Sequence, residues 1–257
     1  MRPVPDFKKL PDGKKLYFAS DFHLGVPNRE QSLERERKIV RWLEEVKSDA
    51  AAIFLVGDLF DFWFEYPSVI PKGFIRFQGK LAELRDSGIP IYMFVGNHDM
   101  WMSDYFEEEL GIPTFHHPIS IETPDHKIQL GHGDGLGPGD YGYKFLKFFF
   151  KGRIFQWMFK WIHPTVGVGI ATFWSKRSRL GQEKKPDAFM GEQEWLYQHC
   201  LKVQEVDHHD YYIFGHRHIP IQMKGDSFEY VNLGEWVNHY TFGVYDGSGM
   251  KLETFEN

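Results

Sequence analysis

In KLYFASDFH, residues 15–23, a strand-like apolar run ends directly in Asp and His, two residue types that bind metal ions. An apolar run followed by Asp, Asn or His recurs four more times along the chain. The five clusters are Asp21-Phe22-His23 after LYFAS, Gly57-Asp58 after AAIFLV, Gly96-Asn97-His98-Asp99 after PIYMFV, Gly131-His132 after KIQL, and Gly215-His216-Arg217-His218 after YYIF. In an α/β sheet, ligands gather at the carboxyl ends of strands, so clusters distant in sequence can meet at one edge. We therefore expect a single site built from all five clusters.

The segments around the first three clusters predict alternating strands and helices. Strands are expected over 15–20, 51–56 and 90–95, and the run 51–56 is apolar enough to be buried on both sides. Helices are expected over 32–47 and 73–85, where apolar residues recur along one face or a Ser-Gly pair ends the run. This order is typical of parallel βαβ units.

The later part of the chain predicts a helix over 192–206, followed by antiparallel closing strands in YYIF, FEYVNL, YTFGVYD and MKLETFE. We interpret the whole chain, 1–257, as one catalytic domain of the α/β class. Residues 136–190 are expected to form a helical, aromatic and basic insert within it.

Composition excludes several classes of protein. With 257 residues, 42% of them hydrophobic, the chain can bury a substantial core. Cys200 is the only cysteine, which excludes an intrachain disulfide and fits a reducing cytoplasm. A net charge of −6 argues against a general nucleic-acid binder. No secretory signal is expected from the first 15 residues, and the longest uncharged stretch, 161–175, has 15 residues where a membrane span needs about 20.

The residue types in the five clusters suit hydrolysis of a phosphate ester or anhydride. Two divalent ions about 3.5–4 Å apart neutralise phosphoryl oxygens and lower the pKa of a water. A mixture of imidazole and oxygen ligands suits Mn, Fe or Zn better than Ca. The candidate ligands are Asp21, His23, Asp58, Asn97, His132, His216 and His218.

His98 and Asp99 are the candidate catalytic pair, because His98 follows a candidate ligand and Asp99 is placed to accept its ring N–H. His98 is expected to donate a proton to the leaving group or to place a cation on the transition-state oxygens. Its alternative role is to position Asn97 without taking part in the reaction.

The insert has an unusual composition. Residues 141–175 contain twelve aromatic residues in 35, and 141–185 carries +9 while the rest of the chain carries −15. Aromatic residues with Lys and Arg are typical of helices that lie in a membrane interface. One interpretation is a lid that holds an acyl-bearing phosphate substrate and touches an anionic bilayer, and the other is an ordinary helical subdomain. The run Ser175 to Arg179 offers hydroxyls and cations to a diphosphate, or is a solvated charge run.

The series D-x-H, G-D, G-N-H-D, G-H and G-H-x-H resembles the calcineurin-like metallophosphoesterase superfamily from Asp21 to His218. The resemblance implies a β-sandwich flanked by helices. It also implies that Asp58 bridges two ions. The first ion would be bound by Asp21, His23, Asp58 and His218, and the second by Asp58, Asn97, His132 and His216.

The chain resembles one branch of that superfamily more closely. The segments GDLFDFW (57–63), HGD (132–134) and LGEW (233–236), with an aromatic insert after HGD, are similar to the UDP-2,3-diacylglucosamine diphosphatases of lipid A biosynthesis. These peripheral inner-membrane enzymes release UMP and 2,3-diacylglucosamine 1-phosphate, and their insert forms the acyl-binding lid. The best-known members have Arg where this chain has His98.

The expected function is therefore a cytoplasmic, membrane-peripheral pyrophosphatase with two divalent ions, most simply Mn²⁺, an acylated UDP-sugar as substrate, and no nucleic-acid partner. We expect the substrate to contact Trp63, Ser175 and Arg179. The alternatives are a metallophosphoesterase for soluble nucleotides or phosphodiesters, and a scaffold without activity. The aromatic insert disfavours the first alternative, and the complete set of ligands disfavours the second.

Overall fold

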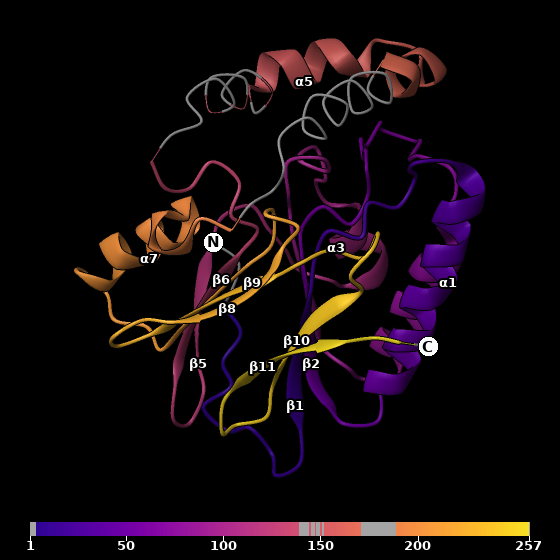
Figure 1. Cartoon of the computed structure of the whole chain (residues 1–257). Coiled ribbons are helices and arrows are strands. Elements are labelled where there is room, and N and C mark those ends of the chain that lie inside the picture. Colours follow the sequence, from indigo (N-terminus) through magenta and orange to yellow (C-terminus); the bar gives the residue numbers. More distant parts are fainter. Residues whose placement is uncertain are drawn as a thin grey trace.

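Two β-sheets pack face to face, and helices cover their outer faces (Figure 1). The structure is a computed structural model that describes residues 4–138, 144, 147, 150, 152–170 and 189–256. The mixed α/β class and the β-sandwich flanked by helices are confirmed.

The first sheet has six strands in the order β11-β10-β1-β2-β3-β4. The strands from β1 to β4 run parallel, as the βαβ pattern predicts, and β10 and β11 add antiparallel strands at one edge. Three helices, α1 (Arg29–Val46), α2 (Ile75–Asp86) and α3 (Tyr105–Leu110), connect its parallel strands. Its strands are β1 (Lys15–Ala19), β2 (Ala50–Val56), β3 (Ile91–Phe94), β4 (Thr114–Phe115), β10 (Thr241–Tyr245) and β11 (Met250–Thr254).

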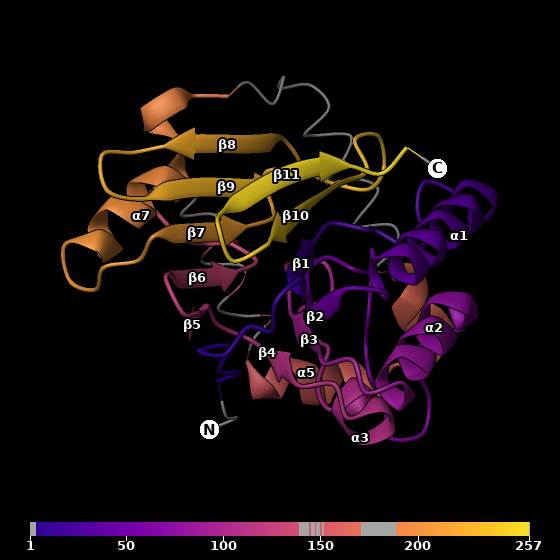
Figure 2. The same cartoon turned by 90° about the horizontal axis from the view of Figure 1, so that it is seen from below.

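The second sheet has five strands in the order β5-β6-β7-β9-β8 (Figure 2). Its strands are β5 (Ile119–Glu122), β6 (Lys127–Gly131), β7 (Tyr211–Phe214), β8 (Pro220–Lys224) and β9 (Glu229–Leu233). The prediction of antiparallel closing strands is correct for β10 and β11 but wrong for the pairing of β7 with β9, which is parallel. The reason is that β8 lies between them in sequence and takes the sheet edge, so β9 returns in the direction of β7.

Strand β2 shows why its sequence is almost entirely apolar. Ile53 and Leu55 belong to the core between the first sheet and helices α1 to α3, whereas Phe54 and Val56 belong to the core between the two sheets. Successive side chains of a strand point to opposite faces, so a strand buried on both faces needs apolar residues at every position.

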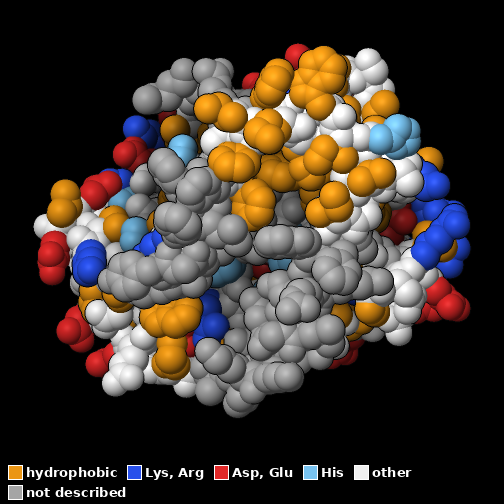
Figure 3. All heavy atoms as spheres, turned by 90° about the horizontal axis from the view of Figure 1, so that it is seen from above, with side chains coloured by type: hydrophobic (Ala, Val, Ile, Leu, Met, Phe, Trp, Pro, Cys, Tyr) orange, Lys and Arg blue, Asp and Glu red, His pale blue; other side chains and the backbone are white. Residues whose placement is uncertain are grey.

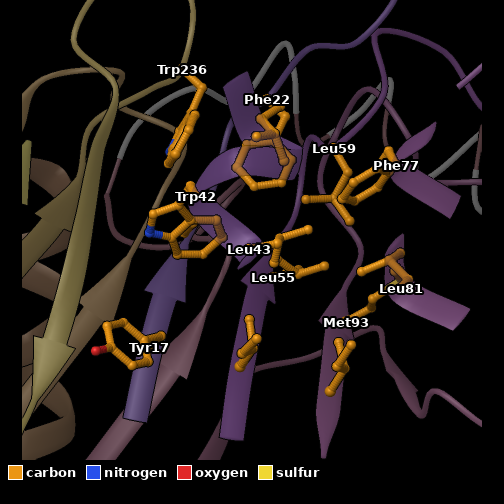
Figure 4. Packing of buried hydrophobic residues seen from close by; sticks show 14 of the residues in the cluster. Tyr17, Phe22, Trp42, Leu43, Leu55, Leu59, Phe77, Leu81, Met93 and Trp236 are labelled. Carbon is orange, nitrogen blue, oxygen red and sulfur yellow. The ribbon is translucent and has the colours of Figure 1, made fainter. Parts of the chain in front are cut away.

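Three apolar clusters stabilise the layers. The first joins the helices to the first sheet through Trp42, Leu43, Phe77 and Leu81 (Figure 4). The second fills the space between the sheets. The third packs α7 (Trp195–Gln204) on the second sheet, and Cys200 lies within it, fully buried, as expected of an inert packing residue.

Hydrogen bonds at the helix starts account for the observed boundaries. Helix α1 begins at Arg29, ahead of the predicted start, because the Asn28 side chain accepts a hydrogen bond from the Gln31 N–H at 3.0 Å. The buried Glu36 carboxylate accepts from the backbone N–H groups of Arg76 and Phe77 and so satisfies the start of α2.

Of the predicted insert, 136–190, the structure describes residues 136–138, 144, 147, 150, 152–170 and 189–190, which include α5 (Arg153–Lys160). A short 3₁₀ turn, η1 (Gly191–Gln193), follows the insert and precedes α7. Helix α5 lies above the two sheets (Figure 1). Among the described residues, no helix combines the length and the hydropathy that a bilayer span requires.

Candidate metal centre

The five sequence clusters meet where strands of both sheets end. Asp21, Asp58 and Asn97 follow β1, β2 and β3 of the first sheet, while His132 and His216 follow β6 and β7 of the second. The two sheets therefore contribute to one site, as the order of strands and clusters predicts.

One group of candidate ligands consists of Asp21, His23, Asp58 and His218, whose ligand atoms lie within 4.8 Å of one another. The Nε2 atoms of His23 and His218 are 3.0 Å apart, and the Asp21 Oδ1 atom lies 3.1 Å from His218 Nε2 and 3.7 Å from His23 Nε2. The Asp58 Oδ2 atom lies 4.0 Å from His23 Nε2. Two imidazole nitrogens and two carboxylate oxygens thus face a common point.

A second group shares Asp58 with the first and adds His132 and His216. The His132 Nε2 atom lies 3.3 Å from Asp58 Oδ2 and 3.2 Å from the Asn97 amide oxygen. The same amide oxygen lies 2.8 Å from His216 Nδ1. The Oδ2 atom of Asp58 therefore belongs to both groups, which is the position that a bridging ligand requires.

The buried polar atoms fit divalent cations. Among the described residues, Asp21 Oδ1 and Asp58 Oδ2 are buried carboxylate oxygens that make no hydrogen bond. A buried carboxylate oxygen without a partner is strongly unfavourable unless a cation compensates it. The other oxygens of these carboxylates are satisfied, since Asp21 Oδ2 accepts from the His216 N–H at 3.0 Å and Asp58 Oδ1 from the His98 N–H at 2.8 Å. The orphaned oxygens are the ones that face the histidines.

The backbone is strained at most of the candidate ligands. Asp21, His23, Asp58, His216 and His218 all have positive φ, between 44° and 69°. Non-glycine residues with positive φ are uncommon and cluster at functional sites, where the surrounding structure holds the strain.

Close backbone packing explains the glycine before Asn97. A Cβ atom on Gly96 would lie 2.2 Å from Asp58 Oδ1 and 2.5 Å from the Asp58 nitrogen. Only glycine permits this approach.

The pKa values of the cluster differ according to burial and neighbouring charge. Burial lowers the pKa of His23 to about 3 and that of His216 to about 4, which keeps both imidazoles neutral, the form that binds metal ions. Burial alone would raise the pKa of Asp21, but the adjacent imidazoles of His218 and His23 hold this pKa well below its usual range. Burial would lower the pKa of His132, but the nearby Asp58 carboxylate raises it well above its usual range.

The ring of His98 contacts Asp61, a residue that the sequence analysis did not single out. The His98 Nδ1 atom lies 3.1 Å from the Asp61 carbonyl oxygen and 3.5 Å from its Oδ1 atom. An N–H on Nδ1 that donates to this carbonyl leaves Nε2 as the nitrogen available to a substrate. The last Asp of GDLFD was the signal that could have identified Asp61, because it follows the Asp58 cluster by three residues.

The prediction that Asp99 accepts a hydrogen bond from the His98 ring is wrong, because the His98 ring contacts Asp61 instead. The Asp99 carboxylate is fully buried and accepts backbone N–H groups from Gly96 at 2.7 Å and Leu59 at 2.8 Å. Burial, with the nearby Asp58 charge, raises the pKa of Asp99 to about 7. Asp99 thus ties the turn that carries Asn97 to the segment after Asp58.

Three residues were expected to contact the substrate, Trp63, Ser175 and Arg179, and the structure describes only the first of them. Trp63 is fully buried against Phe60 and Phe106, and its indole N–H donates to Glu65 at 2.9 Å. The expectation that Trp63 contacts substrate is therefore wrong, because both its ring and its polar atom are used inside the core. Ser175 and Arg179 lie outside the described residues, as do Phe148 and Phe149.

The described part of the insert packs beside the metal centre. The ring of Phe159 on α5 lies 4.7 Å from that of Trp101 and 4.7 Å from that of Phe64, and the Trp101 indole donates to the Phe150 carbonyl at 2.7 Å. Lys147 donates to the Asp134 carbonyl at 2.7 Å and forms an ion pair with its buried carboxylate. Trp101 and Asp134 follow Asp99 and His132 by two residues each, so the insert contacts both sides of the site.

The structure is a sandwich of two sheets, and the ends of its strands bring together two adjoining groups of Asp, Asn and His. This arrangement is typical of metal-dependent phosphoesterases. The family model of the calcineurin-like phosphoesterases matches residues 14–220, and the chain belongs to this family of hydrolases. Its metal requirement follows from the family and from the Asp and His cluster, which suits divalent ions.

Among curated relatives, the chain is similar to UDP-2,3-diacylglucosamine hydrolase of Porphyromonas gingivalis, with 37% identity over 95% of this chain and 98% of the relative. The enzyme of the same name from Proteus mirabilis is 26% identical over 93% of this chain and 97% of its own length. A solved structure of Yfce, a phosphoesterase from E. coli, matches 94% of this chain and 93% of its own chain with 16% identity and a TM-score of 0.48.

Proposed function

We propose that the protein hydrolyses UDP-2,3-diacylglucosamine to UMP and 2,3-diacylglucosamine 1-phosphate, a step of lipid A synthesis. The observation that carries this proposal is the 37% identity over 95% of the chain to an enzyme named for this substrate. The reaction adds one water across the diphosphate, breaks one P–O bond of the bridging oxygen and releases a proton.

The metal groups give the chain's own residues their proposed roles. Asp21, His23, Asp58 and His218 would hold one ion, and Asp58, Asn97, His132 and His216 the other. Bound ions would neutralise phosphoryl oxygens and lower the pKa of the attacking water, and Mn²⁺ is the proposed metal because the ligands mix imidazole with carboxylate.

His98 would act on the substrate from the side of the first group. Its ring lies 4.9 Å from that of His23, and the contact of its Nδ1 atom with Asp61 leaves Nε2 to act on an oxygen of a phosphate that the ions would hold. The proposed role is proton donation to the leaving oxygen, with stabilisation of the transition-state charge as the alternative.

The insert would receive the acyl chains of the substrate. Its inner surface is aromatic where Phe159 meets Phe62, Phe64 and Trp101, and Phe62 follows Asp61 directly. An apolar surface next to a phosphate-binding centre suits a ligand that is charged at one end and greasy at the other.

Phosphate-product analysis with Mn²⁺ tests the proposed substrate. We expect release of UMP from detergent-dispersed UDP-2,3-diacylglucosamine and at least about a hundredfold lower kcat/KM on UDP-N-acetylglucosamine, since the missing acyl contacts are worth several kcal/mol. A chromogenic phosphodiester serves as the control for intact metal chemistry. Turnover of the soluble esters alone would retain the phosphoesterase and contradict the lipid substrate.

We further propose that the outer surface of α5 and the residues after it rests on an anionic membrane. Hydrophobic side chains gather on this face (Figure 3). Trp161 is 76% exposed and Trp157 61%, values far above those usual for large apolar side chains, and Lys160 between them is exposed. Exposed tryptophans beside a lysine are typical of a helix at the level of lipid headgroups. The other exposed apolar residues here are Ile154, Phe155, Met158, Val166 and Ile170.

Replacing both Trp157 and Trp161 by serine is expected to weaken binding to phosphatidylglycerol vesicles by at least about tenfold, because less apolar area is buried in the interface. Cosedimentation measures the effect. The matched control is Val206→Ser, which removes an 89% exposed apolar side chain after the end of α7, away from the insert. Equal vesicle binding of the double variant and the control would contradict membrane contact through α5.

A further inference from the structure

A buried ion pair joins the loop that carries His216 and His218 to the chain at Glu194, just after the insert. The Glu194 side chain is fully buried, and its two oxygens accept from the Nε atom of Arg217 at 2.9 Å and from its terminal nitrogen at 3.2 Å. Arg217 is itself only 13% exposed. A two-point contact between a planar guanidinium and a carboxylate fixes the orientation of both groups, unlike the contact of a lysine.

Arg217 stands between two candidate ligands, His216 and His218. Both histidines have positive φ, 69° and 56°. Such backbone conformations are unfavourable for residues other than glycine and persist only where the surroundings impose them. The Arg217 side chain is one anchor for this loop, and the hydrogen bond from the His216 N–H to Asp21 Oδ2, at 3.0 Å, is another.

Glu194 lies where the chain returns from the insert. Its carboxylate accepts from the Met190 N–H at 3.1 Å, and its carbonyl accepts from the Gln198 N–H at 2.9 Å at the start of α7. The next residue, Trp195, has its ring 5.8 Å from the Arg217 guanidinium. A Cβ atom on Gly137 would lie 2.2 Å from the Trp195 carbonyl oxygen, so the outgoing chain after His132 packs directly on the returning chain.

These contacts place the returning end of the insert against Arg217, the side chain that separates His216 from His218, and the outgoing end against the neighbouring Trp195. We propose that Glu194 is a positioning residue which, through Arg217, holds His216 and His218 in their ligand geometry and couples the base of the insert to metal affinity. Because His218 belongs to one group of ligands and His216 to the other, loss of the pair weakens both ions. This inference rests on the proposed ligand set and is independent of the substrate.

The test measures Mn²⁺ binding without substrate, by the electron paramagnetic resonance signal of free Mn²⁺. We expect Glu194→Gln to weaken binding of both ions by about 10- to 100-fold, the usual effect of removing a group that orients ligands. Arg217→Lys, which keeps the charge and loses the two-point contact, is expected to give a similar loss. The double variant is expected to lose no more than either single variant, because both changes break one interaction.

Glu83→Gln is the control, since it breaks an exposed ion pair with Lys47 and Lys80 far from the site and is expected to bind Mn²⁺ as the unmodified protein does. Dissociation constants of Arg217→Lys equal to those of the unmodified protein would overturn the inference, even if the melting temperature of Glu194→Gln fell. Failure of the unmodified protein to bind two ions would instead overturn the proposed ligand set.

Discussion

Asp58→Asn is expected to lower turnover with Mn²⁺ by at least about a thousandfold, equivalent to about 4 kcal/mol of transition-state stabilisation. The Oδ2 atom of Asp58 faces both groups of ligands, so its replacement by a neutral amide weakens both ions at once. We expect the purified variant to hold fewer than two ions per chain. Metal analysis and kcat, measured on the same preparation, check the two expectations together.

Asp86→Asn is the matched control, because Asp86 is exposed at the end of α2, close to the start of β3 and thus at the opposite end of the strands from the site. It is expected to keep full activity and two ions. An Asp58→Asn protein that retained two ions and turned over within tenfold of the unmodified enzyme would exclude Asp58 as a shared ligand.

His98→Ala is expected to lower kcat by about 100- to 10,000-fold while both ions stay bound, because general acid catalysis contributes about this much. A normal metal content would distinguish this loss from the effect at Asp58. His98→Arg separates the two proposed roles of His98. An arginine keeps a cation near the phosphate but does not readily donate its proton, so recovered activity would favour charge stabilisation and continued loss would favour proton donation.

His208→Ala provides the control, since His208 is exposed beyond the end of α7 and is expected to have no effect on kcat. Near-full turnover of His98→Ala with two ions bound would leave His98 only the task of positioning Asn97.

Local sequence patterns predict the parallel half of the fold well. In β1 and β2 each apolar run is short and continuous and ends in ligand residues, so the type, place and direction of the strands follow from burial on both faces. The convergence of Asp21, Asp58 and Asn97 follows in turn, because the parallel direction of β1, β2 and β3 places the carboxyl ends of these strands together.

Features that depend on long-range packing are not accessible in this way. Nothing local to FEYVNL distinguishes a parallel neighbour from an antiparallel one, and the parallel pairing of β9 with β7 is settled by β8 taking the edge. In the sequence, Trp63 is an aromatic residue near a ligand cluster, but in the structure its side chain is buried in the core. Adjacency in sequence suggested Asp99 as the partner of His98, whereas the fold places Asp61 there.

The division of the candidate ligands between two sheets sets the order of events during synthesis. Three of the ligand-bearing loops belong to the first sheet and are complete once Asn97 has left the ribosome, but the partners His132, His216 and His218 come from the second. Domains generally fold as units, and N-terminal domains fold first during synthesis. On the proposed ligand set, a nascent chain that ends before His216 lacks a ligand of each ion, so metal loading is a late step that follows docking of the two sheets.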